Sequence, residues 1–133
     1  MDLRLRTRPT PDQGQVTVIE VAGELDLHAA PGLRDELARA TQALSPRVIV
    51  DLGGVTFIDS TGVGVLVGAL KRARQAGGQL AFCGAQKRVR RVFEITGLIG
   101  ALPLFEARDE AIAALTGPPD SDSQATELES RDE

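Results

Sequence analysis

The run Arg47-Val48-Ile49-Val50-Asp51-Leu52 constrains the fold most, because it places apolar residues on both faces of an extended segment. This pattern is typical of a central strand in a sheet that is covered on both sides. Gly53-Gly54 then predicts a turn, and an apolar helix is expected from Thr61 to Ala76, ended by Gly77-Gly78. A strand followed by a long helix is the unit from which parallel sheets are built, so we expect an α/β fold.

Further strands and helices are expected on both sides of this unit. Two segments with alternating apolar residues, 3–8 and 15–22, predict a hairpin whose first strand lies at the sheet edge. Apolar residues at helical spacing, the last of them Leu44, predict a helix that begins at Pro31 and ends before Pro46. The remaining expected elements are strands at 79–84 and 102–105, the latter at an edge, and helices at 86–96 and 107–115.

These elements predict a mixed, mostly parallel sheet of about four to five strands, packed with about four helices. We assign residues 1–14 to an N-terminal edge strand and turn, 15–116 to a single folded domain, and 117–133 to an acidic tail. From Pro118 onward the chain has a net charge of −5, whereas the 117 residues before it carry +1. We expect the tail to be disordered, because Leu128 is its only large apolar residue.

Charge and cysteine content narrow the class of protein. A nearly neutral folded part gives no electrostatic basis for direct nucleic-acid binding. The single cysteine, Cys83, permits no internal disulfide and fits a reducing cytosol. The N-terminus has no apolar segment typical of a secretion signal, and the longest apolar run, 62–70, is half the length of a membrane span. We therefore expect a soluble cytoplasmic protein that does not interact with a membrane.

The residue types argue against catalysis. A pair formed by His28 and Ser60 would need an orienting residue and an oxyanion hole, and Ser60 lacks the flanking glycines of a nucleophile elbow. The glycines of segment 62–68 suggest a dinucleotide-binding loop, but an extra loop, 53–59, separates them from the strand. Gly64 and Gly68 are instead expected to let the helix pack close to the sheet. Because metal-ligand spacing is also absent, we expect no enzyme, cofactor or metal.

Four basic residues cluster on the expected helix 86–96, while its apolar residues take the inward positions. A solvated face is the first interpretation of this cluster, and contact with a partner is the alternative. Nucleic acid is disfavoured because no aromatic residues lie between the charges. The four residues are Lys87, Arg88, Arg90 and Arg91.

Ser60 lies where the helix after the central strand is expected to begin. Serine is a preferred N-cap residue, and the same position suits a phosphate because free N–H groups and the helix dipole converge there. If the strands 15–22 and 47–52 are neighbours, the loops with Gly23-Glu24-Leu25-Asp26 and Asp59-Ser60-Thr61-Gly62 share one rim of the sheet. From spacing alone, a plain serine cap remains the better interpretation.

These two motifs, in this order, resemble the STAS domain of bacterial anti-sigma factor antagonists. The match includes Ala30-Pro31-Gly32-Leu33 after the first motif and Val55-Thr56-Phe57-Ile58 before the second. Gly77-Gly78-Gln79-Leu80 and Ile95-Thr96-Gly97-Leu98 also fit, so that the resemblance covers about residues 15–115. It implies a single STAS domain.

The resemblance also implies a partner-switching role. Such an antagonist binds an anti-sigma factor and releases a sigma factor, and the anti-sigma factor is also a serine kinase of the histidine-kinase-like ATPase type. Phosphorylation of the serine that matches Ser60 ends the binding, and a metal-dependent serine phosphatase reverses it. The implied partner-binding residues are Glu24, Asp26, Asp59, Thr61 and Gly62. The alternative is a scaffold-type STAS protein of a multi-protein stress-sensing complex.

Overall fold

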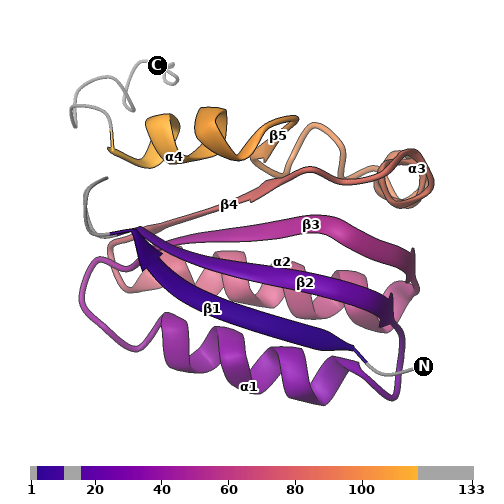
Figure 1. Ribbon diagram of the computed structural model, residues 1–133, viewed down its shortest axis with the longest axis horizontal. Helices are drawn as coiled ribbons and strands as arrows, with labels where there is room; N and C mark the ends of the chain where they lie inside the picture. Colours follow the sequence, from indigo (N-terminus) through magenta and orange to yellow (C-terminus); the bar gives the residue numbers. More distant parts are fainter. Residues whose placement is uncertain (1–2, 11–15, 117–133) are drawn as a thin grey trace.

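The computed structural model describes residues 3–10 and 16–116 of the 133-residue chain. Within these residues, one sheet has the strand order β1-β2-β3-β4-β5 (Figure 1). The strands are β1 (Arg4–Thr10), β2 (Val16–Leu25), β3 (Arg47–Ile58), β4 (Gln79–Cys83) and β5 (Leu104–Phe105), and the helices are α1 (Ala30–Ala40), α2 (Ser60–Gln75), α3 (Lys87–Ile95) and α4 (Arg108–Thr116). The predicted acidic tail, 117–133, lies outside the described residues.

Strand directions confirm the predicted mixed, mostly parallel sheet. β1 pairs with β2 in an antiparallel hairpin at one edge, and every other neighbouring pair is parallel. β5 pairs with β4 at the opposite edge, as predicted from Pro103. The parallel pairing of β2 with β3 brings the ends of these two strands to the same rim, with Leu25 opposite Ile58.

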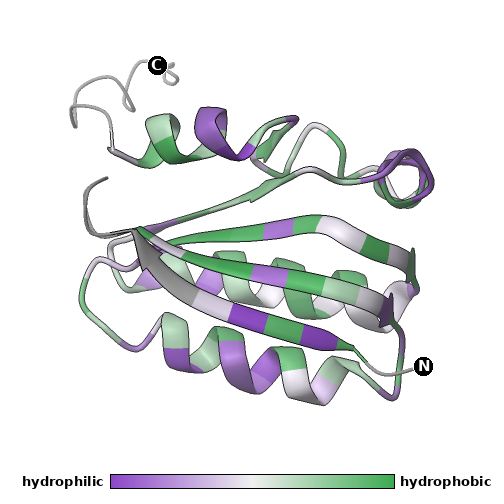
Figure 2. Ribbon diagram, in the orientation of Figure 1, coloured by the Kyte–Doolittle hydropathy of each residue, from purple (hydrophilic) through white to green (hydrophobic). Residues whose placement is uncertain are grey.

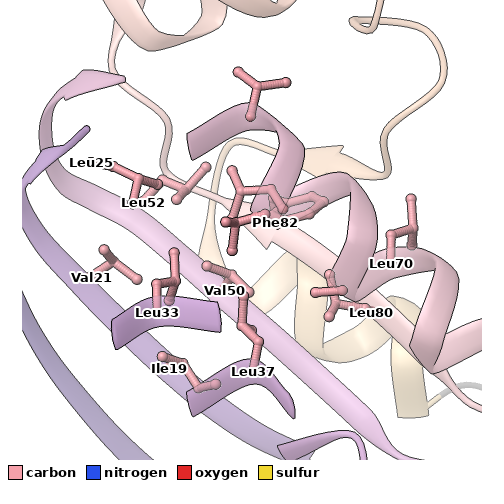
Figure 3. Close-up of a cluster of buried hydrophobic side chains, with 14 of the residues drawn as sticks. Ile19, Val21, Leu25, Leu33, Leu37, Val50, Leu52, Leu70, Leu80 and Phe82 are labelled. Carbon is pink, nitrogen blue, oxygen red and sulfur yellow. The ribbon is translucent and has the colours of Figure 1, made fainter. Parts of the chain in front are cut away.

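Helices α1 and α2 cover one face of the sheet and α4 covers the other (Figure 1). The larger core lies under α1 and α2, where side chains from β2, β3, β4 and both helices point toward one another (Figure 3). The smaller core lies under α4. β3 contributes to both, because Val50 belongs to the larger core and Ile49 to the smaller one. This confirms the prediction of a central strand covered on both faces.

The predicted end of the central strand is wrong. β3 continues through Gly53 and Gly54 to Ile58 instead of turning at the glycines. A Cβ on Gly54 would lie 2.7 Å from the Cβ of Ala22 on the neighbouring strand, so glycine is needed there for close strand approach. The register of β2 against β3 also shifts between Glu20 and Ala22, as at a β-bulge.

The predicted end of the first helix is also wrong. α1 ends at Ala40, and Leu44, which was expected to continue its apolar face, is 92% exposed. Thr41 is buried at this end, and its hydroxyl donates a hydrogen bond of 2.8 Å to the carbonyl oxygen of Leu37. The predicted end of α2 is confirmed, because Gly77 follows it with a φ of 79° that favours glycine.

Candidate functional site

The two sequence motifs meet at one rim of the sheet. The backbone N–H of Asp59 donates a hydrogen bond of 3.3 Å to the carbonyl oxygen of Leu25 at the end of β2. The loop before α1 and the first turn of α2 are therefore neighbours, as predicted from the assumption that β2 and β3 are adjacent. Binding sites of parallel sheets form at such a rim, because the loops after adjacent strands converge there.

Asp59 joins the two loops through its carboxylate. Oδ1 accepts a hydrogen bond of 3.0 Å from the backbone N–H of Gly62, and Oδ2 accepts one of 3.0 Å from the N–H of Leu27. The first bond makes Asp59 the N-cap of α2, so the prediction that Ser60 is the cap is wrong. Aspartate suits this position because its carboxylate also faces the positive end of the helix dipole.

Ser60 is instead the first residue of α2, and it is exposed. The N–H groups of Gly62 and Val63 are used by Asp59, through its side chain and its carbonyl oxygen. The N–H groups of Ser60 and Thr61 have no hydrogen-bond partner in the described part of the chain. A phosphate on the Ser60 hydroxyl would thus lie beside two free amide donors and the helix dipole.

Asp26 has a local structural role at the same rim. Its Oδ1 accepts hydrogen bonds from the N–H groups of His28 and Ala29, at 3.1 and 3.0 Å, and its carbonyl oxygen accepts from Ala29 and Ala30. These hydrogen bonds fix the turn that leads into α1. Glu24 is half-buried and lies opposite Phe57 in the pairing of β2 with β3. That Glu24 and Asp26 contact a partner stays a prediction.

Gly62 is the glycine that lets α2 approach the sheet. It is buried, and a Cβ on it would lie 2.6 Å from the carbonyl oxygen of Leu25 and 3.0 Å from the Cγ1 of Ile58. Gly64 is exposed with nothing within 4 Å of such a Cβ, and a Cβ on Gly68 would meet only a side-chain atom at 3.6 Å. The close-packing role predicted for Gly64 and Gly68 therefore belongs to Gly62.

Two large apolar side chains at this rim were not predicted. Leu27 is 62% exposed, and its backbone is tied to Asp59, while Phe57 is 48% exposed near the end of β3. We call this edge of the sheet, where Leu27, Phe57 and Ser60 are exposed, the Ser60 rim. Phe57 could have been found from the sequence by extending β3, because its neighbour Ile58 points inward. Thr61 is half-buried at the edge of this surface.

The basic cluster lies on α3, which is largely hydrophilic (Figure 2). The Arg88 guanidinium donates a hydrogen bond of 3.4 Å to the carbonyl oxygen of Thr56, and the amide of Gln86 donates one of 2.8 Å to that of Gly53. These contacts hold the start of α3 against the end of β3. Contact of this cluster with a partner stays a prediction.

The described residues give no sign of a catalytic or metal centre. Within 3–10 and 16–116, no group of three or more His, Cys, Asp or Glu side chains could hold a metal ion. No hydrogen bond joins the side chains of His28 and Ser60. β3 reaches Ile58, so the extra loop that argued against a dinucleotide site does not exist. In the part of the chain that is described, no helix is long and apolar enough to cross a membrane.

Comparison with known proteins decides the family. The sequence model of the STAS domain matches residues 8–111. The chain belongs to the STAS domain family. This confirms the resemblance drawn from the two rim motifs, and the single STAS domain with its five-stranded sheet is the fold that the motifs implied.

Relatives of this STAS domain are named as anti-sigma factor antagonists. The Anti-sigma-B factor antagonist of Staphylococcus aureus is 38% identical over 89 residues, which are 67% of this chain and 82% of that protein. The crystal structure of an anti-sigma factor antagonist from Mycobacterium paratuberculosis has a TM-score of 0.75 at 26% identity, covering 86% of this chain and 95% of the other. The Bacillus cell fate determinant SpoIIAA in its phosphorylated form has the same fold, with a TM-score of 0.62 at 24% identity over 84% of this chain and 98% of that one.

Proposed function

We propose that this STAS domain protein is an anti-sigma factor antagonist whose binding is switched by phosphorylation of Ser60. The observation that carries the proposal is the position of Ser60, an exposed hydroxyl on the first residue of α2 beside two free amides. Relatives named as anti-sigma factor antagonists support the class of partner. In its unphosphorylated form the protein binds an anti-sigma factor in the cytoplasm and thereby releases a sigma factor.

The Ser60 rim is suited to contact a protein. Leu27 and Phe57 offer exposed apolar surface, and a partner that covers them removes this surface from water. Asp59 and Asp26 hold the two loops in place through hydrogen bonds to backbone amides. The rim is therefore preorganised, and little conformational entropy is lost when a partner binds.

In this proposal an external kinase phosphorylates the chain, which supplies the acceptor hydroxyl of Ser60. The partner itself is the kinase in this proposal, an anti-sigma factor with a histidine-kinase-like ATPase domain. The Ser60 Oγ attacks the γ-phosphorus of ATP, the bond to the β-phosphate oxygen breaks, and ADP leaves while the hydroxyl proton passes to a base of the kinase. A metal-dependent serine phosphatase later returns the serine by hydrolysis.

A phosphate on Ser60 opposes the complex by charge and by hydration. It adds about −1.5 to −2 units of charge beside the Asp59 carboxylate at pH 7. The two free amides and the helix dipole stabilise the phosphate without refolding the domain. A partner that packs on Leu27 and Phe57 would then have to desolvate this charge, and so the phosphorylated form dissociates.

The site assignment is tested by mapping the phosphate. The wild type, Ser60→Ala and Thr61→Ala are incubated with ATP and the cognate anti-sigma factor kinase, followed by intact-mass measurement and peptide mapping. We expect one phosphate on the wild type and on Thr61→Ala, and none on Ser60→Ala. Phosphorylation of Ser60→Ala to the wild-type level would show that the acceptor lies elsewhere. Thr61 is a matched control because it is the adjacent hydroxyl on the same turn of α2.

A further inference from the structure

An apolar groove lies at the opposite end of the sheet from the Ser60 rim. It has a volume of about 340 Å³ and is bounded by the start of β4, by β5 and by the last turn of α4. In Figure 1, β5 and α4 lie beside β4 at the top of the view, at the β5 edge of the sheet. Arg74, exposed in the last turn of α2, is the one charged residue among the described residues that line it. Its apolar walls are Leu80, Ala81, Pro103, Phe105, Ala114 and Leu115.

The sheet edge beside this groove is incomplete. β5 has two residues, which pair only with Phe82 and Cys83 of β4. Phe82 and Gly84 direct their N–H groups toward the β5 side, where they donate to the carbonyl oxygens of Pro103 and Phe105. Because backbone groups alternate in direction along a strand, the N–H and C=O of Leu80 also point to this side. Leu80 precedes the two residues of β4 that pair with β5. No described strand pairs with Leu80 there, and such an edge accepts a further extended segment.

The geometry points to residues 127–129 of this chain, Glu127-Leu128-Glu129, as the occupant of the groove. The C-terminal segment begins at the groove, because α4 ends at Thr116 and the preceding Leu115 is part of the wall. Leu128 is the one large apolar residue after Thr116, and an acidic residue flanks it on each side. Leu128 covers the apolar walls and the backbone of the segment pairs with Leu80, while a flanking carboxylate faces the Arg74 guanidinium.

Because residues 127–129 are covalently linked to α4, even a weak contact with the groove is enough for them to occupy it. Leu128 lies twelve positions after Thr116, and a flexible chain of this length spans roughly 19 Å between its ends. A tether of that kind gives an effective concentration on the order of millimolar. The docked segment lies at the far end of the parallel strands from Ser60 and leaves the Ser60 rim open. This proposal does not depend on phosphorylation of Ser60.

Paramagnetic broadening in the full-length protein tests the contact. A nitroxide is attached at Ser130→Cys, and the buried Cys83 stays unlabelled in the native protein. We expect loss of the amide signals of Leu80, Ala81 and Ala114, and recovery of these signals in Leu128→Ser. Broadening that is unchanged in Leu128→Ser, or that falls on other surfaces, would overturn the proposal.

Arg74 provides an independent test with matched controls. Arg74→Glu should restore the broadened signals, and combining it with Glu127→Lys and Glu129→Lys should broaden them again. Lys71→Glu, on the same helix but outside the groove, and Ala125→Ser, in the same segment, should leave the broadening unchanged. Loss of the contact in Lys71→Glu as well would mean a non-specific charge effect. Broadening in an isotope-labelled chain mixed with a separate spin-labelled chain would identify a second copy as the occupant and contradict the proposal.

Discussion

Replacing Gly62 by alanine perturbs the contact that seats α2 on the sheet. The added Cβ would lie 2.6 Å from the carbonyl oxygen of Leu25 and 2.8 Å from its Cγ. Real Cβ atoms do not approach a backbone oxygen this closely, so the first turn of α2 has to move outward. That movement also lengthens the hydrogen bond from Gly62 N–H to Asp59.

The expected magnitude follows from two opposing effects. Overpacking in a close contact costs about 1–3 kcal/mol, whereas alanine gains up to about 1 kcal/mol over glycine in a helix. We expect Gly62→Ala to lower the free energy of unfolding by about 1–2 kcal/mol. Gly64→Ala is the matched control, because position 64 lies on the same helix with open space around a Cβ, and it should gain about 1 kcal/mol.

Thermal and urea unfolding of the two variants measure this difference. A gap of about 2–3 kcal/mol corresponds to roughly 8–12 °C in Tm for a domain of this size. Equal Tm values for Gly62→Ala and Gly64→Ala, or a Gly62→Ala variant as stable as the wild type, would refute the reasoning. Phosphorylation of Gly64→Ala should proceed as in the wild type, since the start of α2 is unchanged.

Three further predictions concern side chains with defined partners. Asp59→Ala should lower the free energy of unfolding by about 1–2 kcal/mol in urea titrations, since two backbone amides lose their acceptor. Arg108→Ala should lower the free energy of unfolding by about 1–2 kcal/mol in the same titrations, because the carboxylates of Glu20 and Asp51 lose the guanidinium that both contact, which is one-third exposed. Burial raises the pKa of the Cys83 thiol to about 11, so a disulfide reagent at pH 8 should react only as the protein unfolds.

Most of the fold could be predicted from the sequence, because the spacing of apolar residues indicates which side of each strand or helix is buried. β3, with Ile49 and Val50 on opposite faces, could be placed at the centre, and the hairpin and the edge position of β5 followed from alternation and from Pro103. The end of β3 was predicted wrongly at Gly53-Gly54, because glycine occurs both in turns and where two strands approach closely. Only the position of Ala22 on the neighbouring strand distinguishes these two uses of Gly54.

The meeting of the two motifs at one rim was predicted, but the details of the rim were not. The two motifs gave the rim, since adjacent parallel strands end together. Serine and aspartate are both good N-caps, so the choice of Asp59 over Ser60 depends on which backbone oxygen starts the helix, and local sequence does not decide that. The backbone of the exposed Leu27 is held by a hydrogen bond from its amide to Asp59, 32 positions away in the chain, which local sequence does not reveal.

The affinity of the cognate anti-sigma factor for the two forms of this protein tests the central claim most directly. Isothermal titration compares the unphosphorylated chain with the chain carrying one phosphate on Ser60. Charge repulsion and desolvation at a packed interface cost several kcal/mol. We therefore predict that phosphorylation raises the Kd of the complex by a factor of about 100 or more. Equal affinities for the two forms would contradict the account, because Ser60 would then be a modified surface residue and not a switch.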